Sequence, residues 1–149
     1  MTVVVDANLL ASQALPLPYG DLAIQRLRLW QMSEELIIAP VLLVYELTTI
    51  MRKAITAGWL SETAAAERLS EILQTGPLLI PPDDDLNREA LFWAKRIGQN
   101  KAYDSHYLAL AARESATLWT ADRRLANGAQ QAGLAQVHWI GDWSPDENQ

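Results

Sequence analysis

The chain has 149 residues, of which 50% are hydrophobic and 20% are charged, a composition that suits one globular domain and excludes a disordered chain. It contains no cysteine, which excludes disulfides, thiolate zinc sites and cysteine nucleophiles. The formal net charge of -6 argues against a module that holds nucleic acid through phosphate contacts alone, but not against an enzyme whose carboxylates bind divalent cations.

Membrane and export signals are not expected. No apolar run approaches the roughly 18 residues that a membrane span needs, and the longest, residues 36–44, is interrupted by Pro40. No basic region precedes the first apolar stretch, so residues 1–5 indicate a strand and not a signal peptide. We therefore expect a cytoplasmic protein with one domain over residues 1–141 and a polar tail over residues 142–149.

Strand and helix patterns alternate along the chain. Short runs of β-branched and aliphatic residues predict strands at 2–5, 36–39, 78–80, 117–120 and 136–140. Amphipathic spacing, helix-starting residues and glycine stops predict helices at 9–14, 21–33, 41–57, 61–76, 83–97, 103–115 and 123–132. The alternation predicts an α/β fold with a central parallel sheet of about five strands and helices on both faces. In such sheets the ligand crevice lies outside the carboxyl ends of the strands.

Two acidic residues stand where predicted strands end. Asp6 follows the strand at 2–5, and Asp122 follows the strand at 117–120, two positions after the hydroxyl of Thr120. Because parallel strands end at one edge of a sheet, we expect both carboxylates to meet there. The alternative for each is an N-cap of the next helix, a position that Asp often takes.

Two further acids belong to predicted helices. Glu46 is a single carboxylate in the apolar stretch 41–51, where burial is costly unless a cation compensates, and the alternative is a solvated helix position. Asp104 opens a Leu- and Ala-rich helix, where the helix dipole favours an acid whatever its function. His106 and the Asp run at 83–85 are weaker candidates. We expect Tyr103, Tyr107 and the tryptophans to lie mainly in the core.

In chain order these four acids resemble the pattern of the PIN domain, above all of the VapC-type toxins of bacterial toxin–antitoxin pairs. The resemblance covers nearly the whole chain and is most specific over residues 102–125. It implies a ribonuclease whose metal-binding and catalytic acids are Asp6, Glu46, Asp104 and Asp122. It places Asn8 and Thr120 beside them. It also implies an RNA substrate, a small protein antitoxin and a homodimer.

Hard oxygen ligands favour Mg²⁺ or Mn²⁺ as the cofactor. Attack by a metal-activated water would leave a 5′-phosphate and a 3′-hydroxyl. The chain departs from the family in two respects, because its net charge is low for an RNA binder and only Lys101, Arg123 and Arg124 are basic near the motifs.

Three alternatives stay open. A phosphatase of the haloacid dehalogenase type needs a second Asp where this chain has Asn8. A PIN-like fold can also serve as a non-catalytic binding module, or as a nuclease in RNA processing outside a toxin pair.

Overall fold

A five-stranded parallel sheet forms the centre of the computed structural model, which describes residues 1–148; Gln149, at the end of the expected tail, lies outside the described residues. The strands are β1 (Thr2–Val5), β2 (Leu36–Pro40), β3 (Leu78–Ile80), β4 (Thr117–Thr120) and β5 (Val137–Trp139). They lie in the order β3-β2-β1-β4-β5, and each neighbouring pair is parallel. The predicted α/β class and the expected number of strands are therefore confirmed.

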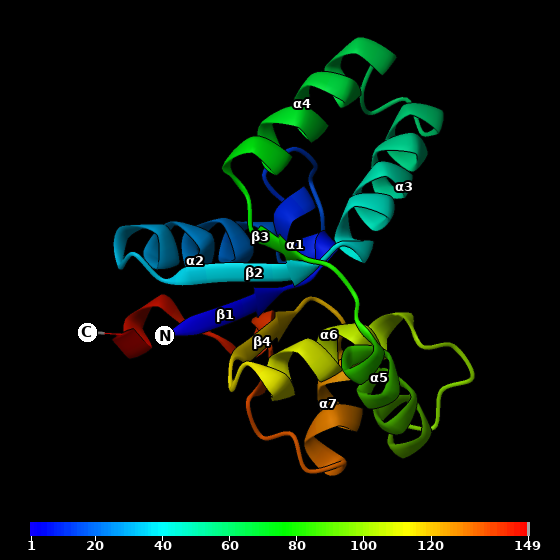
Figure 1. Cartoon of the computed structure of the whole chain (residues 1–149). Coiled ribbons are helices and arrows are strands. Elements are labelled where there is room, and N and C mark those ends of the chain that lie inside the picture. The colour runs from blue at the N-terminus through cyan, green and yellow to red at the C-terminus, as the bar shows by residue number, and fades with distance from the viewer. Residues whose placement is uncertain (149) are drawn as a thin grey trace.

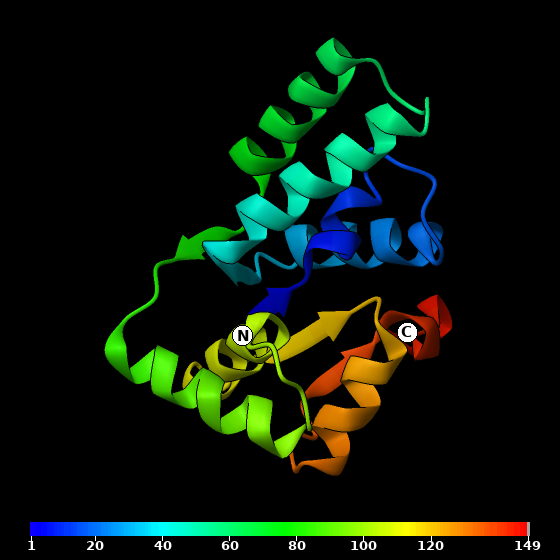
Figure 2. The ribbon, with the colours of Figure 1, turned by 90° about the vertical axis from the view of Figure 1, so that its right-hand side faces the viewer.

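Helices cover both faces of the sheet, as predicted. They are α1 (Ala7–Ala11), α2 (Gly20–Met32), α3 (Leu42–Thr56), α4 (Glu62–Thr75), α5 (Asp84–Arg96), α6 (Tyr103–Arg113) and α7 (Arg123–Gln131). The two views show α1 to α4 on one face and α5 to α7 on the other, with the α3–α4 pair projecting away from the sheet (Figures 1 and 2).

The strand order creates a switch point between β1 and β4. From β1 the chain builds outward through β2 to β3, and then crosses the other face to β4 and continues to β5. The connections that leave β1 and β4 thus lie on opposite faces, which opens a crevice beyond the carboxyl ends of these two neighbouring strands. Both strands end in an acid, Asp6 and Asp122, so the topology alone brings two of the predicted site residues to this crevice.

The centre of the sheet is tightly buried. Val4 and Val5 of β1 and Leu118 of β4 are inaccessible to solvent. Helix α6 packs against β1, β2 and β4, and all its residues from Tyr107 to Ala111 are buried. This rigid helix and the two central strands form the base on which the crevice is built.

The N-terminus of α1 differs from its prediction by two residues. Helix α1 begins at Ala7 because the Asp6 side chain caps it, accepting a hydrogen bond of 3.0 Å from the backbone N–H of Leu9. The sequence pattern had suggested a start at Leu9, where the apolar spacing becomes helical.

After β5 the chain forms two short 3-10 helices, η1 (Ile140–Asp142) and η2 (Pro145–Asn148), and η2 contacts α2. Trp143 between them is buried, with the Arg26 guanidinium 5.3 Å from its ring. The domain boundary at residue 141 stays a prediction. Over residues 1–148, no helix combines the length and apolar character that crossing a membrane requires.

Candidate functional site

A cleft of about 840 Å³ lies at the carboxyl edge of the sheet and gathers all six residues singled out from the sequence. Four of them are acids, Asp6, Glu46, Asp104 and Asp122, which we call the cleft carboxylates. Asn8 and Thr120 also line the cleft. Asp6 and Asp122 follow the ends of β1 and β4, Glu46 lies on α3, and Asp104 lies in the first turn of α6.

Asp6 ties the ends of β1 and β4 together. One carboxylate oxygen caps α1, and the other accepts hydrogen bonds from the Thr120 hydroxyl at 2.6 Å and from the backbone N–H of Ala121 at 3.0 Å. The capping role considered from the sequence therefore coexists with a position in the cleft. A carboxylate with three donors is held in a single orientation.

Thr120 joins the two strand-ending acids. Its fully buried hydroxyl donates to Asp6 and accepts a hydrogen bond of 2.9 Å from the backbone N–H of Asp122. Asp122 in turn caps α7, where one of its oxygens accepts from the backbone N–H groups of Arg124 and Leu125. The second oxygen of Asp122 accepts no hydrogen bond within residues 1–148.

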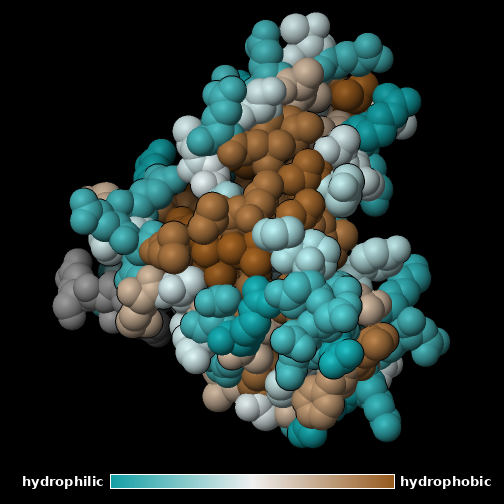
Figure 3. Space-filling model, in the orientation of Figure 1, coloured by the Kyte–Doolittle hydropathy of each residue, from teal (hydrophilic) through white to brown (hydrophobic). Residues whose placement is uncertain are grey.

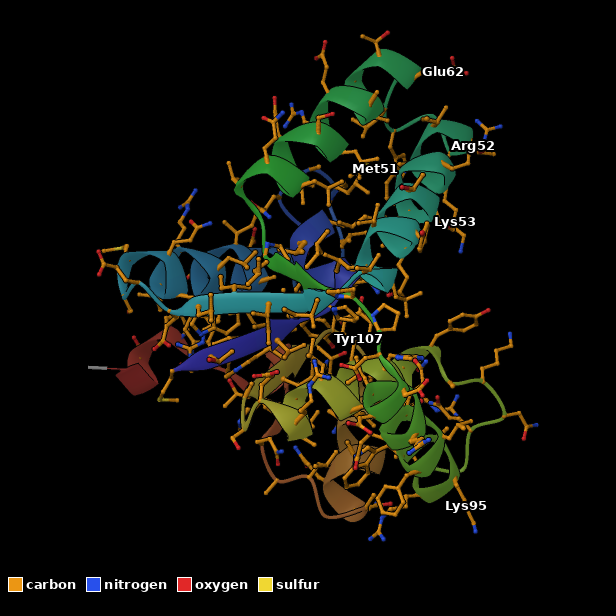
Figure 4. All side chains as sticks on the ribbon, viewed as in Figure 1. Met51, Arg52, Lys53, Glu62, Lys95 and Tyr107 are labelled. Atoms are coloured by element: carbon orange, nitrogen blue, oxygen red, sulfur yellow. The ribbon has the colours of Figure 1, made fainter. Side chains whose placement is uncertain are left out.

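The helix-borne acids are positioned by side chains. The Tyr107 hydroxyl of α6 donates a hydrogen bond of 2.5 Å to Glu46 of α3, and Tyr107 is only 3% exposed. Figure 4 shows Tyr107 between α6 and the start of α3. The Gln99 amide donates a longer bond of 3.3 Å to Asp104. In the described part of the chain, the other oxygen of Glu46 and that of Asp104 accept no hydrogen bond.

The cleft concentrates negative charge. Burial raises the pKa of Asp6, and its hydrogen bonds from Thr120, Leu9 and Ala121 partly oppose the rise. Burial also raises the pKa of Glu46, and the charges on Asp104 and Asp6 add to the increase. The pKa of Asp104 is raised by burial and by the neighbouring Asp122. Among residues 1–148, no lysine or arginine forms an ion pair with a cleft carboxylate, so no ion pair offsets this repulsion.

The donor set fits a divalent cation. Three of the cleft carboxylates each keep an oxygen without a hydrogen-bond donor, and hard oxygen ligands of this kind are those that Mg²⁺ and Mn²⁺ prefer. As placed in residues 1–148, no three His, Asp or Glu side chains enclose a metal position directly. This spacing is compatible with Mg²⁺, which usually retains several waters and takes only one or two protein carboxylates.

The structure also adds residues that the sequence did not single out. Tyr107 is buried as expected, but its hydroxyl reaches Glu46, a contact between residues 61 positions apart that no local pattern reveals. Tyr103 was expected to lie in the core, and this expectation is wrong: its ring is 60% exposed and lines the cleft. His106 is partly buried and does not line the cleft, and burial lowers its pKa.

A sequence model of the PIN domain matches residues 4–140 of the chain. No curated protein sequence matches it.

Several solved structures share the fold. FitAcB from Neisseria gonorrhoeae is 19% identical with a TM-score of 0.66, over 95% of this chain and 99% of that one. VapBC2 from Rickettsia felis, bound to a DNA fragment from its promoter, is 15% identical with a TM-score of 0.66, over 97% of this chain and 100% of that one. VapC20 from Mycobacterium tuberculosis, a Sarcin-Ricin loop cleaving toxin, is 18% identical with a TM-score of 0.63, over 91% of this chain and 98% of that one. At these identities the likeness establishes the architecture.

Proposed function

The chain belongs to the PIN-domain family, and we propose that it is a metal-dependent endoribonuclease that hydrolyses RNA phosphodiester bonds. The observation that carries the proposal is the cleft itself. Four carboxylates, two that follow the ends of β1 and β4 and two on α3 and α6, converge at the switch point of the sheet, with no protein cation paired to them in residues 1–148. Such an arrangement costs stability in the folded protein unless a cation occupies it.

The metal-binding residues we propose are Asp6, Glu46, Asp104 and Asp122, and the cofactor is Mg²⁺ or Mn²⁺. When bound, the metal would neutralise the charge of the scissile phosphate and promote ionisation of the attacking water. The chain's own contribution is positioning: three donors fix Asp6, Thr120 links it to Asp122, and Tyr107 holds Glu46. The expected products carry a 5′-phosphate and a 3′-hydroxyl.

Two polar side chains, those of Asn8 and Thr120, complete the proposed site. Asn8 is exposed in the first turn of α1 and lines the cleft, where its side-chain amide can contact a substrate phosphate. Thr120 is buried and acts on the acids, not on the substrate.

The biological setting we propose is a type II toxin–antitoxin pair, in the cytoplasm, with this chain as the toxin. The support is the shared fold with VapBC2 and with VapC20, a Sarcin-Ricin loop cleaving toxin. The inhibiting partner would then be a small protein antitoxin.

A homodimer is the second assembly that we propose. β3 is an edge strand, and Leu78 on it and Leu36 on β2 are exposed to 58% and 51%. Figure 3 shows hydrophobic surface continuing over these strands and up along the α3–α4 pair. Exposed apolar sheet edges favour association and are commonly covered in the native assembly, which supports a second copy of the chain on this face.

The test of the nuclease is cleavage of a mixed RNA pool by the purified protein in Mg²⁺ or Mn²⁺, compared with EDTA. We expect metal-dependent cutting that Asp104→Asn and Glu46→Gln abolish. Glu62→Gln is the matched control, because Glu62 is an exposed acid at the start of α4, well away from the cleft (Figure 4). Products ending in a 2′,3′-cyclic phosphate, or cutting that persists in EDTA, would contradict the proposed chemistry.

A further inference from the structure

Each of the two walls of the cleft carries one tyrosine and one lysine, and the cleft carboxylates form the floor between them. On one wall α3 presents Tyr45 and Lys53. The other wall carries Lys101, which precedes α6, and Tyr103, the first residue of α6. All four residues line the cleft. Both tyrosines are strongly exposed, Tyr45 to 67% and Tyr103 to 60%.

Neither wall pair is explained by contacts within the protein. In the part of the chain that the structure describes, neither tyrosine ring stacks on another aromatic ring or forms a side-chain hydrogen bond, and neither lysine forms an ion pair. Tyrosine gains free energy when its ring face is covered, so two open rings facing one cleft indicate a surface shaped for a ligand.

The charges of the walls match a nucleic acid. The net charge of the chain is -6, and the floor of the cleft adds local repulsion, so a polyanion needs cations close to the floor in order to bind. Lys53 and Lys101 are cations that line the cleft, one on each side. Figure 4 shows Lys53 on the side of α3 that faces the α5–α6 half of the molecule, whereas its neighbour Arg52 extends away.

On the basis of the proposed function, we propose that the walls hold the nucleotides on either side of the scissile phosphate. Tyr45 and Tyr103 stack on unpaired bases, and Lys53 and Lys101 contact the phosphates that flank the cut. Every base offers a face for stacking, whereas bases inside a duplex are already stacked on one another. The walls therefore favour cutting at nucleotides that can leave a helix.

The direct test is RNA binding by a cleavage-deficient protein. A fluorescent single-stranded RNA of mixed sequence is titrated in Mg²⁺ with Asp104→Asn protein, followed by anisotropy. Adding Tyr45→Ala or Tyr103→Ala should weaken binding by about 5- to 150-fold each, the range of one lost base stack. Tyr103→Phe should retain binding, since stacking needs the ring and not the hydroxyl. Trp59→Ala, an exposed aromatic residue outside the cleft, should have no effect.

The lysines are tested by the salt dependence of the same titration. Each phosphate contact on a single strand contributes about 0.7 to the slope of log affinity against log salt, so Lys53→Ala and Lys101→Ala should each reduce the slope by about that amount. Arg52→Ala and Lys95→Ala remove cations whose side chains point away from the cleft and should leave the slope unchanged (Figure 4).

The outcomes separate this proposal from the nuclease proposal. If the wild-type protein cuts RNA and the wall variants bind and cut like wild type, the proposed role of the walls is wrong while the nuclease proposal stands. The walls would then be available to a protein ligand. Wild-type protein that neither binds nor cuts RNA would overturn the proposed function. Weakened binding with a shifted cutting pattern in the tyrosine variants would support both.

Discussion

Asp6 and Asp104 occupy one cleft, yet replacing each with asparagine should change stability in opposite directions. Asp6 accepts three hydrogen bonds. In Asp6→Asn an amide N–H group replaces one of the accepting oxygens. The Thr120 hydroxyl can rotate to accept from it, but the backbone N–H of Ala121 cannot. One buried donor is then left without an acceptor, which costs about 1–3 kcal/mol. Burial also raises the pKa of Asp6, so removing its charge returns part of this cost.

The same substitution at Asp104 removes no strong hydrogen bond and relieves the repulsion between Asp104 and Asp122. Its hydrogen bond from Gln99 is long, at 3.3 Å, and an amide oxygen accepts it equally well. Burial and the charge on Asp122 both raise the pKa of Asp104 and so oppose its ionised form. Removing such a charge from a strained functional site stabilises by roughly 0.5–2 kcal/mol.

Thermal unfolding followed by circular dichroism, at neutral pH in EDTA, measures the contrast. At about 2–4 °C per kcal/mol for a chain of this size, Asp6→Asn should lower the Tm by up to about 12 °C and Asp104→Asn should raise it by about 1–8 °C. Glu67→Gln, at an exposed position inside α4 and away from its first turn, should leave the Tm unchanged. If both cleft variants raise the Tm by the same amount, Asp6 behaves as any buried charge and the hydrogen-bond argument fails.

Three more predictions concern the same framework. Tyr107→Phe removes the donor to Glu46 and should lower the free energy of unfolding by roughly 1–2 kcal/mol, measured in urea, together with the cleavage rate; an unchanged rate would mean that the hydroxyl does not position the acid. The fold raises the pKa of Asp104 above its ordinary value of 3.8. The protonated carboxyl is therefore the form that the fold tolerates better, and stability falls as the pH rises and Asp104 ionises. The Tm advantage of Asp104→Asn in EDTA should therefore grow from acid to neutral pH, and a constant advantage would refute this origin. Gly141→Ala would make the new Cβ clash with the indole of Trp139 and should destabilise the fold by about 1–3 kcal/mol. Gly128→Ala, on an open helix face, should stabilise slightly, and equal effects of the two would contradict the clash.

The strand-end acids could be predicted because one rule covers them. Every strand of a parallel sheet ends at the same edge, so Asp6 and Asp122 had to share that edge once the strands were recognised. Their neighbourhood was less predictable. The strand order, which makes β1 and β4 adjacent, depends on crossovers that periodicity does not encode.

The tyrosines show where sequence reasoning reaches its limit. Tyr103 and Tyr107 lie four positions apart on one helix in an apolar context, and both were expected in the core. Only Tyr107 is buried, because it faces α3 across the cleft, whereas Tyr103 stands at the open end of α6. The difference depends on where α3 lies, which is a tertiary property.

The hydrogen bond from the Thr120 hydroxyl to the Asp6 carboxylate joins residues that are 114 positions apart in the chain. Closing a loop of this length costs more chain entropy than a local contact does, and folds rich in such contacts fold slowly. During synthesis Asp6 leaves the ribosome early, but its partners on β4 and the acid at 122 follow only when about four fifths of the chain has been made. A nascent or prematurely ended chain therefore holds some of the acids without the cleft that would make them act together. Synthesis through β4 and Asp122 is thus a built-in condition for any activity of this cleft.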